Sequence, residues 1–134
     1  MLVLIFDPDN KIYLQKRSRK KQFYPGRWDV SASTHTEPGE SFSEAAVRVV
    51  RDKLGLETDR LHFVRQLPAC PETGFEFVSI FALHRNTLTI TPNPEAVDEG
   101  YYYSREELTC LVRNFRELLT PQLVTLWETG TIDS

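Results

Sequence analysis

The chain has 134 residues, of which 40% are hydrophobic and 26% charged, and this balance predicts one globular domain over residues 1–134. Its formal net charge of −3 and pI near 5.6 argue against nucleic acid as a partner. Two cysteines are too few for a disulfide framework, and the apolar opening stretch is too short for a signal peptide or membrane span, so we expect a cytoplasmic protein without membrane contact.

The N-terminal segment predicts two strands and a basic loop. Residues 2–6 form a continuous apolar run, and residues 11–17 alternate with Ile12 and Leu14 on one side. Because the residues between them, 7–10, have strong turn chemistry, we expect the two strands to pair as a hairpin. Basic residues crowd the loop 18–27 that follows.

Residues 27–57 are the most informative segment, because they predict a strand, a polar loop, a capped helix and a glycine stop in turn. Ser41 begins a capping box with Glu44, so the helix should start at about Phe42. Gly55 can adopt the left-handed conformation that ends a helix. Apolar residues recur at a period of about 3.6 and predict the buried side: Ala46, Val47, Val50 and Leu54.

The second half of the chain predicts further strands at residues 61–67 and 75–83, then a loop and strand over 93–103. Ser104 and Glu107 make another capping box, which opens a helix to about Leu119. Thr120 and Pro121 begin the last helix as cap and first residue, and Gly130 ends it.

The loop and helix of residues 34–56 resemble the Nudix box, in which Gly, five residues, Glu and seven residues precede Arg-Glu-apolar-any-Glu-Glu-any-Gly-apolar. The positions that agree are Glu40, Arg48, Val50, Gly55 and Leu56. The lead-in over residues 28–35 is most similar to the isopentenyl-diphosphate-isomerase-like branch of the family. The resemblance implies an α/β fold, a Nudix-type α/β/α sandwich with a mixed β-sheet.

The chain departs from the box at the positions that hold metal in the family. Thr34 replaces the first glycine, and Val49, Asp52 and Lys53 replace the three helix glutamates. On a helical wheel these last three residues lie on one face of the helix. Of the three, only Asp52 has a carboxylate that could still bind a metal there. The resemblance thus implies a degenerate Nudix box.

Whether this site holds a metal cofactor depends on where the side chain of Lys53 lies. Asp52 with Glu40 could meet the minimum that Mg²⁺ needs from protein carboxylates. However, an ammonium within about 5 Å repels a divalent ion by roughly 2 kcal/mol even in a medium like water. Either Lys53 turns to solvent and the cofactor is Mg²⁺ or Mn²⁺, or Lys53 replaces the cation and there is none. Glu76 aligns with a metal-binding glutamate of the isomerase and is a third candidate ligand, although an exposed glutamate is the simpler interpretation.

Candidate ligand-binding residues surround this segment. The basic loop is either simply solvated or a rim that grips phosphate oxygens, and its best donors are Arg17, Lys20 and Arg27. Trp28, His35 and Lys53 complete the set, although His35 alone also fits a loop hydrogen-bonding role. In many Nudix hydrolases a glutamate before the last strand is the general base. Of Glu95, Asp98 and Glu99, we take Glu99 with Glu40 and Asp52 as the candidate catalytic residues.

Three functions follow from the resemblance. The first is hydrolysis of a nucleoside diphosphate linked to another group, or of another small-molecule diphosphate, with impaired catalytic residues. The second is a catalytically silent domain that senses such a ligand or binds a protein partner. The third, isoprenoid diphosphate isomerisation, is disfavoured because Ser33 stands where the isomerase has a cysteine, whose thiol titrates near 8.5. A homodimer remains open.

Overall fold

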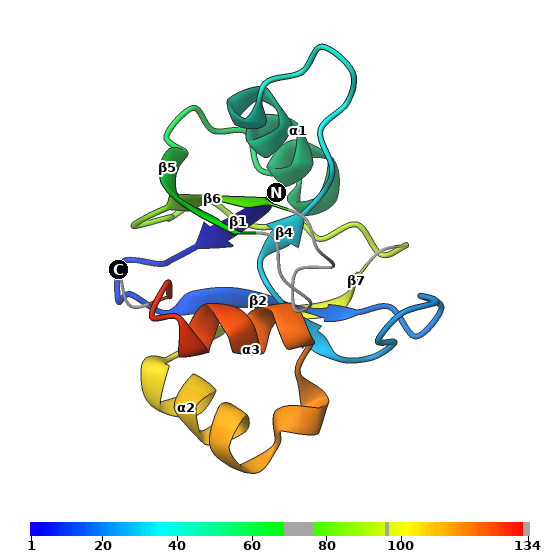
Figure 1. Ribbon diagram of the computed structural model, residues 1–134, viewed down its shortest axis with the longest axis vertical. Helices are drawn as coiled ribbons and strands as arrows, with labels where there is room; N and C mark the ends of the chain where they lie inside the picture. The colour runs from blue at the N-terminus through cyan, green and yellow to red at the C-terminus, as the bar shows by residue number, and fades with distance from the viewer. Residues whose placement is uncertain (69–76, 96, 133–134) are drawn as a thin grey trace.

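The computed structural model describes residues 1–68, 77–95 and 97–132. Its helices are α1 (Phe42–Leu54), α2 (Arg105–Asn114) and α3 (Pro121–Glu128), with a 3-10 turn at Arg116–Leu118. Its strands are β1 (Leu2–Ile5), β2 (Ile12–Arg17), β3 (Trp28–Asp29), β4 (Ala32–Ser33), β5 (His62–Leu67), β6 (Val78–Leu83) and β7 (Val97–Tyr103). Figure 1 shows α1 on one side of the strands and α2 and α3 on the other. The α/β/α sandwich implied by the sequence is confirmed.

The strands form two sheets rather than one. The first has the order β4-β1-β6-β5 and is mixed, because β1 runs parallel to β6 and antiparallel to β4. The second, β3-β2-β7, is antiparallel. The predicted hairpin of the first two strands is therefore wrong, since β1 has β4 and β6 along its two edges. Just beyond the end of β1, Phe6 forms an isolated antiparallel bridge with Ile12, the first residue of β2.

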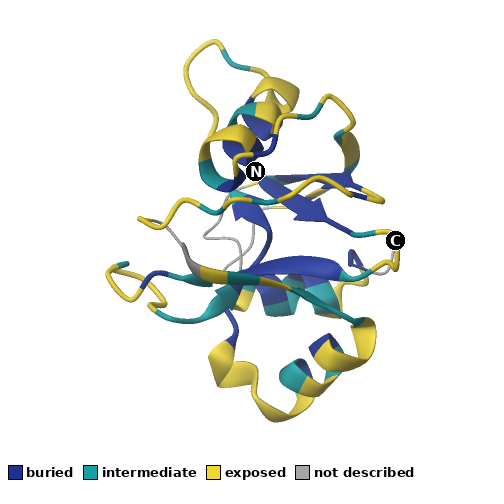
Figure 2. Ribbon diagram, turned by 180° about the vertical axis from the view of Figure 1, so that it is seen from behind, coloured by how far each residue is buried: buried dark blue, intermediate teal, exposed yellow. Residues whose placement is uncertain are grey.

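Alternate residues of the strands pack into two hydrophobic cores. Leu2 and Leu4 of β1 face a core that includes residues of α2 and α3, here called the α2/α3 core. Val3 and Ile5 face a core beneath α1, here called the α1 core. Because side chains alternate along a strand, the central strands β1 and β2 are buried on both sides. Figure 2 shows the buried residues on the strands and on the inner sides of the helices.

Two short strands replace the single strand predicted after Arg27. β3 joins the second sheet and β4 the first, so the chain crosses between sheets at Val30 and Ser31. The Ser31 hydroxyl accepts from the amide of Ile5 at 2.9 Å and donates to the carbonyl of Tyr13 at 2.5 Å. A buried serine thus links β1 of one sheet to β2 of the other.

The helix starts agree with the predictions, and some other details do not. Val47 is exposed, because the buried side of α1 contains Val49 instead. The helix predicted to reach Leu119 ends at Asn114, and the 3-10 turn follows. The strand predicted over 75–83 begins at Val78, with residues 75 and 76 outside the described part of the chain. None of the helices in the described ranges is long and apolar enough to cross a membrane.

Candidate functional site

The loop before α1 is held in one conformation by local hydrogen bonds. Ser41 accepts from the amide of Glu44 at 3.1 Å, and the Glu44 carboxylate accepts from the amide of Ser41 at 3.0 Å, which completes the predicted capping box. The amide of Glu40 donates to the carbonyl of Glu37 at 3.0 Å, and Gly39 provides the positive φ of 80° that this turn uses. The turn and the capped helix start bring residues 37–41 together at the N-terminal end of α1.

Glu40 of this loop is bound by Arg48 of α1. Arg48 Nε donates to Glu40 Oε2 at 2.8 Å and its Nη2 to Oε1 at 3.0 Å, while the amide of Glu37 donates to Oε1 at 3.0 Å. These bonds lower the pKa of Glu40, with Arg48 as the largest cause. Arg48 also donates to the carbonyl of His35 at 2.9 Å. Arg48 and the amide of Glu37 thus fix this carboxylate, which fastens the loop to α1.

The three substituted box positions do not share one environment. Val49 is buried in the α1 core with 1% of its surface exposed. The side chain of Asp52 is 54% exposed and accepts from Arg51 Nε at 3.1 Å. Lys53 crosses to β4, where its Nζ donates to the carbonyl of Ser33 at 2.6 Å. Lys53 therefore does not turn to solvent, and its role in place of a cation stays a prediction.

Other cations gather around Lys53. Burial is the largest cause that lowers the pKa of Lys53, and repulsion by Lys21 and Arg17 comes next, while Asp29 opposes them. Lys21 is half-buried, whereas Lys20 is exposed. The sequence analysis named Lys20 and missed Lys21, because adjacent residues of a basic loop look alike until the loop is folded. Arg17, predicted from the sequence, is near Lys53.

Asp29 is a site residue that the sequence analysis missed. It is 1% exposed, and its Oδ1 accepts from the amide of Val30 at 2.8 Å, from Thr120 Oγ1 at 2.8 Å and from Gln122 Nε2 at 2.9 Å. Its Oδ2 pairs with Arg17 Nη1 at 3.4 Å. Arg17 also donates from Nε to the carbonyl of Phe23 at 3.0 Å. Asp29 thus fixes Arg17 at the end of β2 and fastens the start of α3.

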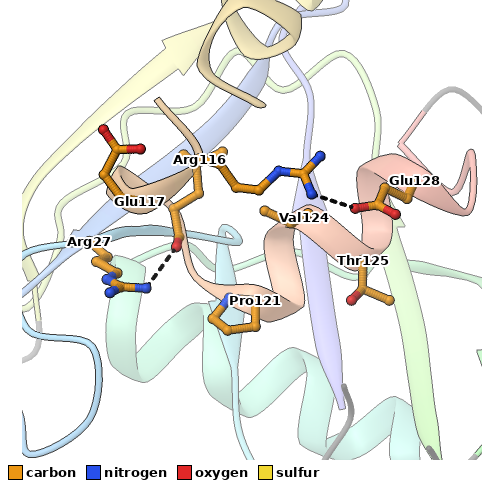
Figure 3. A pocket seen from close by; sticks show the side chains of 8 residues that line it. Arg27, Arg116, Glu117, Pro121, Val124, Thr125 and Glu128 are labelled. Carbon is orange, nitrogen blue, oxygen red and sulfur yellow. Dashed lines mark hydrogen bonds and ion pairs between the residues drawn. The ribbon is translucent and has the colours of Figure 1, made fainter. Parts of the chain in front are cut away.

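Arg27 and Trp28 lie on the other side of the strands. Trp28 packs against the α2/α3 core and meets Tyr103 edge to face, with ring centroids 5.1 Å apart. Arg27 Nη1 donates to the carbonyl of Leu119 at 3.5 Å. It lines a hollow of about 470 Å³ along α3, where Arg116 pairs with Glu128 at 3.4 Å (Figure 3). The structure therefore does not bring Arg27 and Trp28 together with Lys53.

The candidate general base also lies apart from the other candidate catalytic residues. Glu99 lies on the same face of β7 as Tyr101 and Tyr103, and Tyr103 borders the α2/α3 core. The charge of Glu99 contributes to the raised pKa of Tyr103, which agrees with this placement. Because strand residues alternate between faces, Glu99 points away from α1, which carries Asp52. The structure does not bring Glu99 to Glu40 and Asp52.

The described side chains include no cluster of three metal-binding groups. Hard cations need several oxygen ligands, usually including carboxylates. Within residues 1–68, 77–95 and 97–132, no three His, Cys, Asp or Glu side chains come together as a possible metal site. Glu76 lies outside the described residues, as does the side chain of Asp98. Their proposed roles stay predictions.

Comparison with known proteins gives one consistent family. Residues 1–123 match the family model described as NUDIX domain. The isopentenyl-diphosphate Delta-isomerase 1 of Photorhabdus laumondii is 26% identical over 129 residues, which cover 92% of this chain and 73% of that protein. The isopentenyl-diphosphate Delta-isomerase of Ruegeria pomeroyi is 31% identical over 121 residues, covering 86% and 67%. An uncharacterized Nudix hydrolase of Listeria monocytogenes is 28% identical over 109 residues, covering 81% and 64%.

Solved structures agree on the fold. A Deinococcus radiodurans protein superposes with a TM-score of 0.82 at 22% identity, covering 93% of this chain and 77% of its own. A MutT protein from Methanosarcina mazei gives 0.72 at 18% identity, covering 98% and 89%. The NUDIX domain of Shewanella oneidensis NrtR, solved with ADP ribose, gives 0.65 at 12% identity, covering 97% and 84%.

Proposed function

Because this chain belongs to the Nudix family, we propose that it binds a small molecule that contains a diphosphate, such as a nucleoside diphosphate linked to another group, and that its hydrolysis of this ligand is weak or absent. The observation that carries the proposal is the position of Lys53, which lies against Ser33 of β4 near Arg17 and Lys21. Ammonium and guanidinium groups are the usual donors to phosphate oxygens.

The weakness of catalysis follows from the carboxylates. Hydrolysis by a metal-activated water needs a cation held in place by protein ligands. Glu40 is bound to Arg48 through both carboxylate oxygens, and Asp52 is largely in solvent beside Arg51. Loss of the partners of metal ligands already costs about 10- to 100-fold in metal affinity or activity, and loss of ligands should cost more.

Isoprenoid diphosphates belong among the ligands to test, because two relatives carry the isomerase name. Isomerisation itself is disfavoured, since by resemblance Ser33 occupies the place of the catalytic cysteine. The carbonyl of Ser33 accepts from Lys53 at 2.6 Å, so this residue has a supporting role for the lysine.

Thermal unfolding with and without ligand tests the proposal. ADP-ribose, ADP and isopentenyl diphosphate are each added to the protein, with adenosine as the control that lacks phosphate. A ligand at 100 times its Kd stabilises the folded state by about 2.7 kcal/mol, which raises the Tm by several degrees. Product release is followed in the same samples. A Tm that rises with a diphosphate and not with adenosine, with little product, supports the proposal. If no diphosphate changes the Tm, or if turnover is rapid, the proposal is wrong.

A further inference from the structure

We propose that Lys53 serves this site as a built-in cation, so that the ligand is a diphosphate free of metal and Mg²⁺ weakens its binding. The inference rests on the proposed function, because it needs a diphosphate ligand near Lys53. It goes further in naming the charge state of that ligand and the effect of a divalent ion.

The position of Lys53 is fixed from both ends. Its backbone belongs to the last turn of α1, which is capped by Gly55 at a φ of 61°. Its ammonium donates to the carbonyl of Ser33 at 2.6 Å across to β4. An ammonium has three N–H donors, and one is used by this bond. The other two remain for phosphate oxygens, and the bond to Ser33 holds the ammonium at β4 before any ligand arrives.

The neighbours of Lys53 add positive charge. Lys21 and Arg17 repel it, and the opposing carboxylate of Asp29 is buried and already accepts from three donors besides Arg17. Arg17 is already held by Asp29 and by the carbonyl of Phe23. Ordering its guanidinium around a ligand therefore costs little further side-chain entropy. Among the charged groups that act on Lys53, three cations (Lys21, Arg17 and Arg48) stand against the one carboxylate of Asp29, which leaves a local excess of positive charge. A polyphosphate relieves this repulsion, and a divalent cation increases it.

The effect of Mg²⁺ follows from this charge balance. In a site with carboxylates, Mg²⁺ bridges protein and diphosphate, so that it strengthens binding. Here Glu40 is occupied by Arg48, and Asp52 is in solvent. Mg²⁺ bound to the diphosphate neutralises part of the charge that Lys53, Lys21 and Arg17 would recognise. The metal complex should therefore bind more weakly than the free diphosphate.

Calorimetry with ADP and with isopentenyl diphosphate tests the inference on the full chain, in EDTA and in millimolar MgCl₂. The variants are Lys53→Met, which keeps the length of the side chain and removes its charge, Lys53→Arg, which keeps the charge, and Lys21→Met. The matched control is Lys11→Met, because Lys11 precedes β2 at the end opposite Arg17 and loses the same charge. Unfolding of each variant by heat verifies that it is folded.

We expect the wild type to bind in EDTA and to lose affinity in MgCl₂. Lys53→Met should weaken binding in EDTA by about 10- to 100-fold, the usual effect of a lost bond to a charged group. Lys53→Arg should retain more affinity than Lys53→Met, Lys21→Met should show a smaller loss, and Lys11→Met should bind as the wild type does. If Lys53→Met fails to fold, the inference is tested by the loss of affinity in Lys21→Met and by the change in wild-type affinity on addition of MgCl₂. Binding that requires Mg²⁺ overturns this inference and leaves the proposed function standing. Binding of neither ligand under either condition overturns both.

Discussion

The partner of Glu40 decides what this carboxylate can do. A glutamate at this place in the box was a candidate metal ligand by resemblance, yet in the fold Arg48 donates to both of its oxygens. Charge-assisted bonds of this paired kind are stronger than neutral ones and fix geometry. Because the pair joins the loop to α1, its removal should lower the stability of the protein more than it changes any reaction at the site.

Replacement of Glu40 by glutamine should lower the Tm near neutral pH, with a pH dependence of known sign. The pKa of Glu40 is held below its usual 4.5, chiefly by Arg48. The stabilisation is therefore fully present above about pH 4.5 and is lost as the pH falls through the lowered pKa. The difference in Tm between wild type and Glu40→Gln, measured by circular dichroism, should shrink as the solution is made acid. Glu57→Gln, at an exposed glutamate beyond α1, is the control. Equal Tm values near neutral pH would contradict the role of the ion pair.

Residue types and spacings predicted part of the site and could not predict the rest. Glu40, Arg48 and Lys53 were singled out by the box pattern, and their roles in binding or catalysis stay predictions. The sequence could not choose Lys21 over Lys20, because that choice depends on how the loop folds back. It also could not reveal Asp29, whose partners Thr120 and Gln122 come from the last helix and its cap.

At the scale of elements, the end of α1 depends on Gly55. Its φ is 61°, and a Cβ there would lie 3.2 Å from the carbonyl oxygen of Thr91. Gly130 has a similar φ of 73°, and a Cβ on it would meet no atom within 4 Å. An alanine at either position would therefore have to adopt a left-handed backbone, and at position 55 its Cβ would also make a tight contact.

Alanine substitution at the two glycines should separate these costs. Gly130→Ala should lower the free energy of unfolding by about 1 kcal/mol, the usual cost of the left-handed conformation. Gly55→Ala should cost more, about 2 kcal/mol, because the carbonyl of Thr91 must also move. Urea unfolding measures both. Equal losses would show that the Thr91 contact relaxes without cost.

The second sheet has a comparable constraint at Gly100, which pairs with Gln15 of β2. A Cβ on Gly100 would overlap the hydroxyl and ring of Tyr13, which is 5% exposed in the α1 core. Gly100→Ala should therefore destabilise the protein by about 3 kcal/mol, the upper part of the range for overpacking. In a Tyr13→Leu background the same change should cost much less. Urea unfolding of the four proteins completes the cycle, and additive losses would contradict the overlap.

Elements whose signals are local followed the sequence most closely. Both capping boxes formed as predicted, with Ser41 and Ser104 accepting from the amides three residues later. Strand partners are set by contacts between distant residues, and there the hairpin expected of β1 and β2 failed. A single strand was also expected after Arg27, because no local signal marks the crossing between sheets at Ser31.

At the scale of the whole molecule, two sheets share one layer and bury their residues in two cores. Tyr13 lies in the α1 core, and Tyr103 borders the α2/α3 core. Burial is the largest cause that raises the pKa of each to about 12, aided by Tyr102 for Tyr13 and first by Glu99 for Tyr103. The folded protein thus holds both phenol protons more tightly than the unfolded chain does, whose tyrosines titrate near 10.

This difference predicts loss of stability in alkali through both cores. Because the folded-state pKa is raised, the stabilisation is fully present below about pH 10 and is lost as the pH rises through about 12. The free energy of unfolding, measured in urea, should fall across this interval. Tyr13→Phe and Tyr103→Phe should each make the fall less steep, since phenylalanine has no proton to lose, and the double variant should do so further. Tyr24→Phe, at an exposed tyrosine, is the control. If the steepness is unchanged in both single variants, the phenols are not what couples folding to alkaline pH. If only one variant changes it, that core alone carries the coupling.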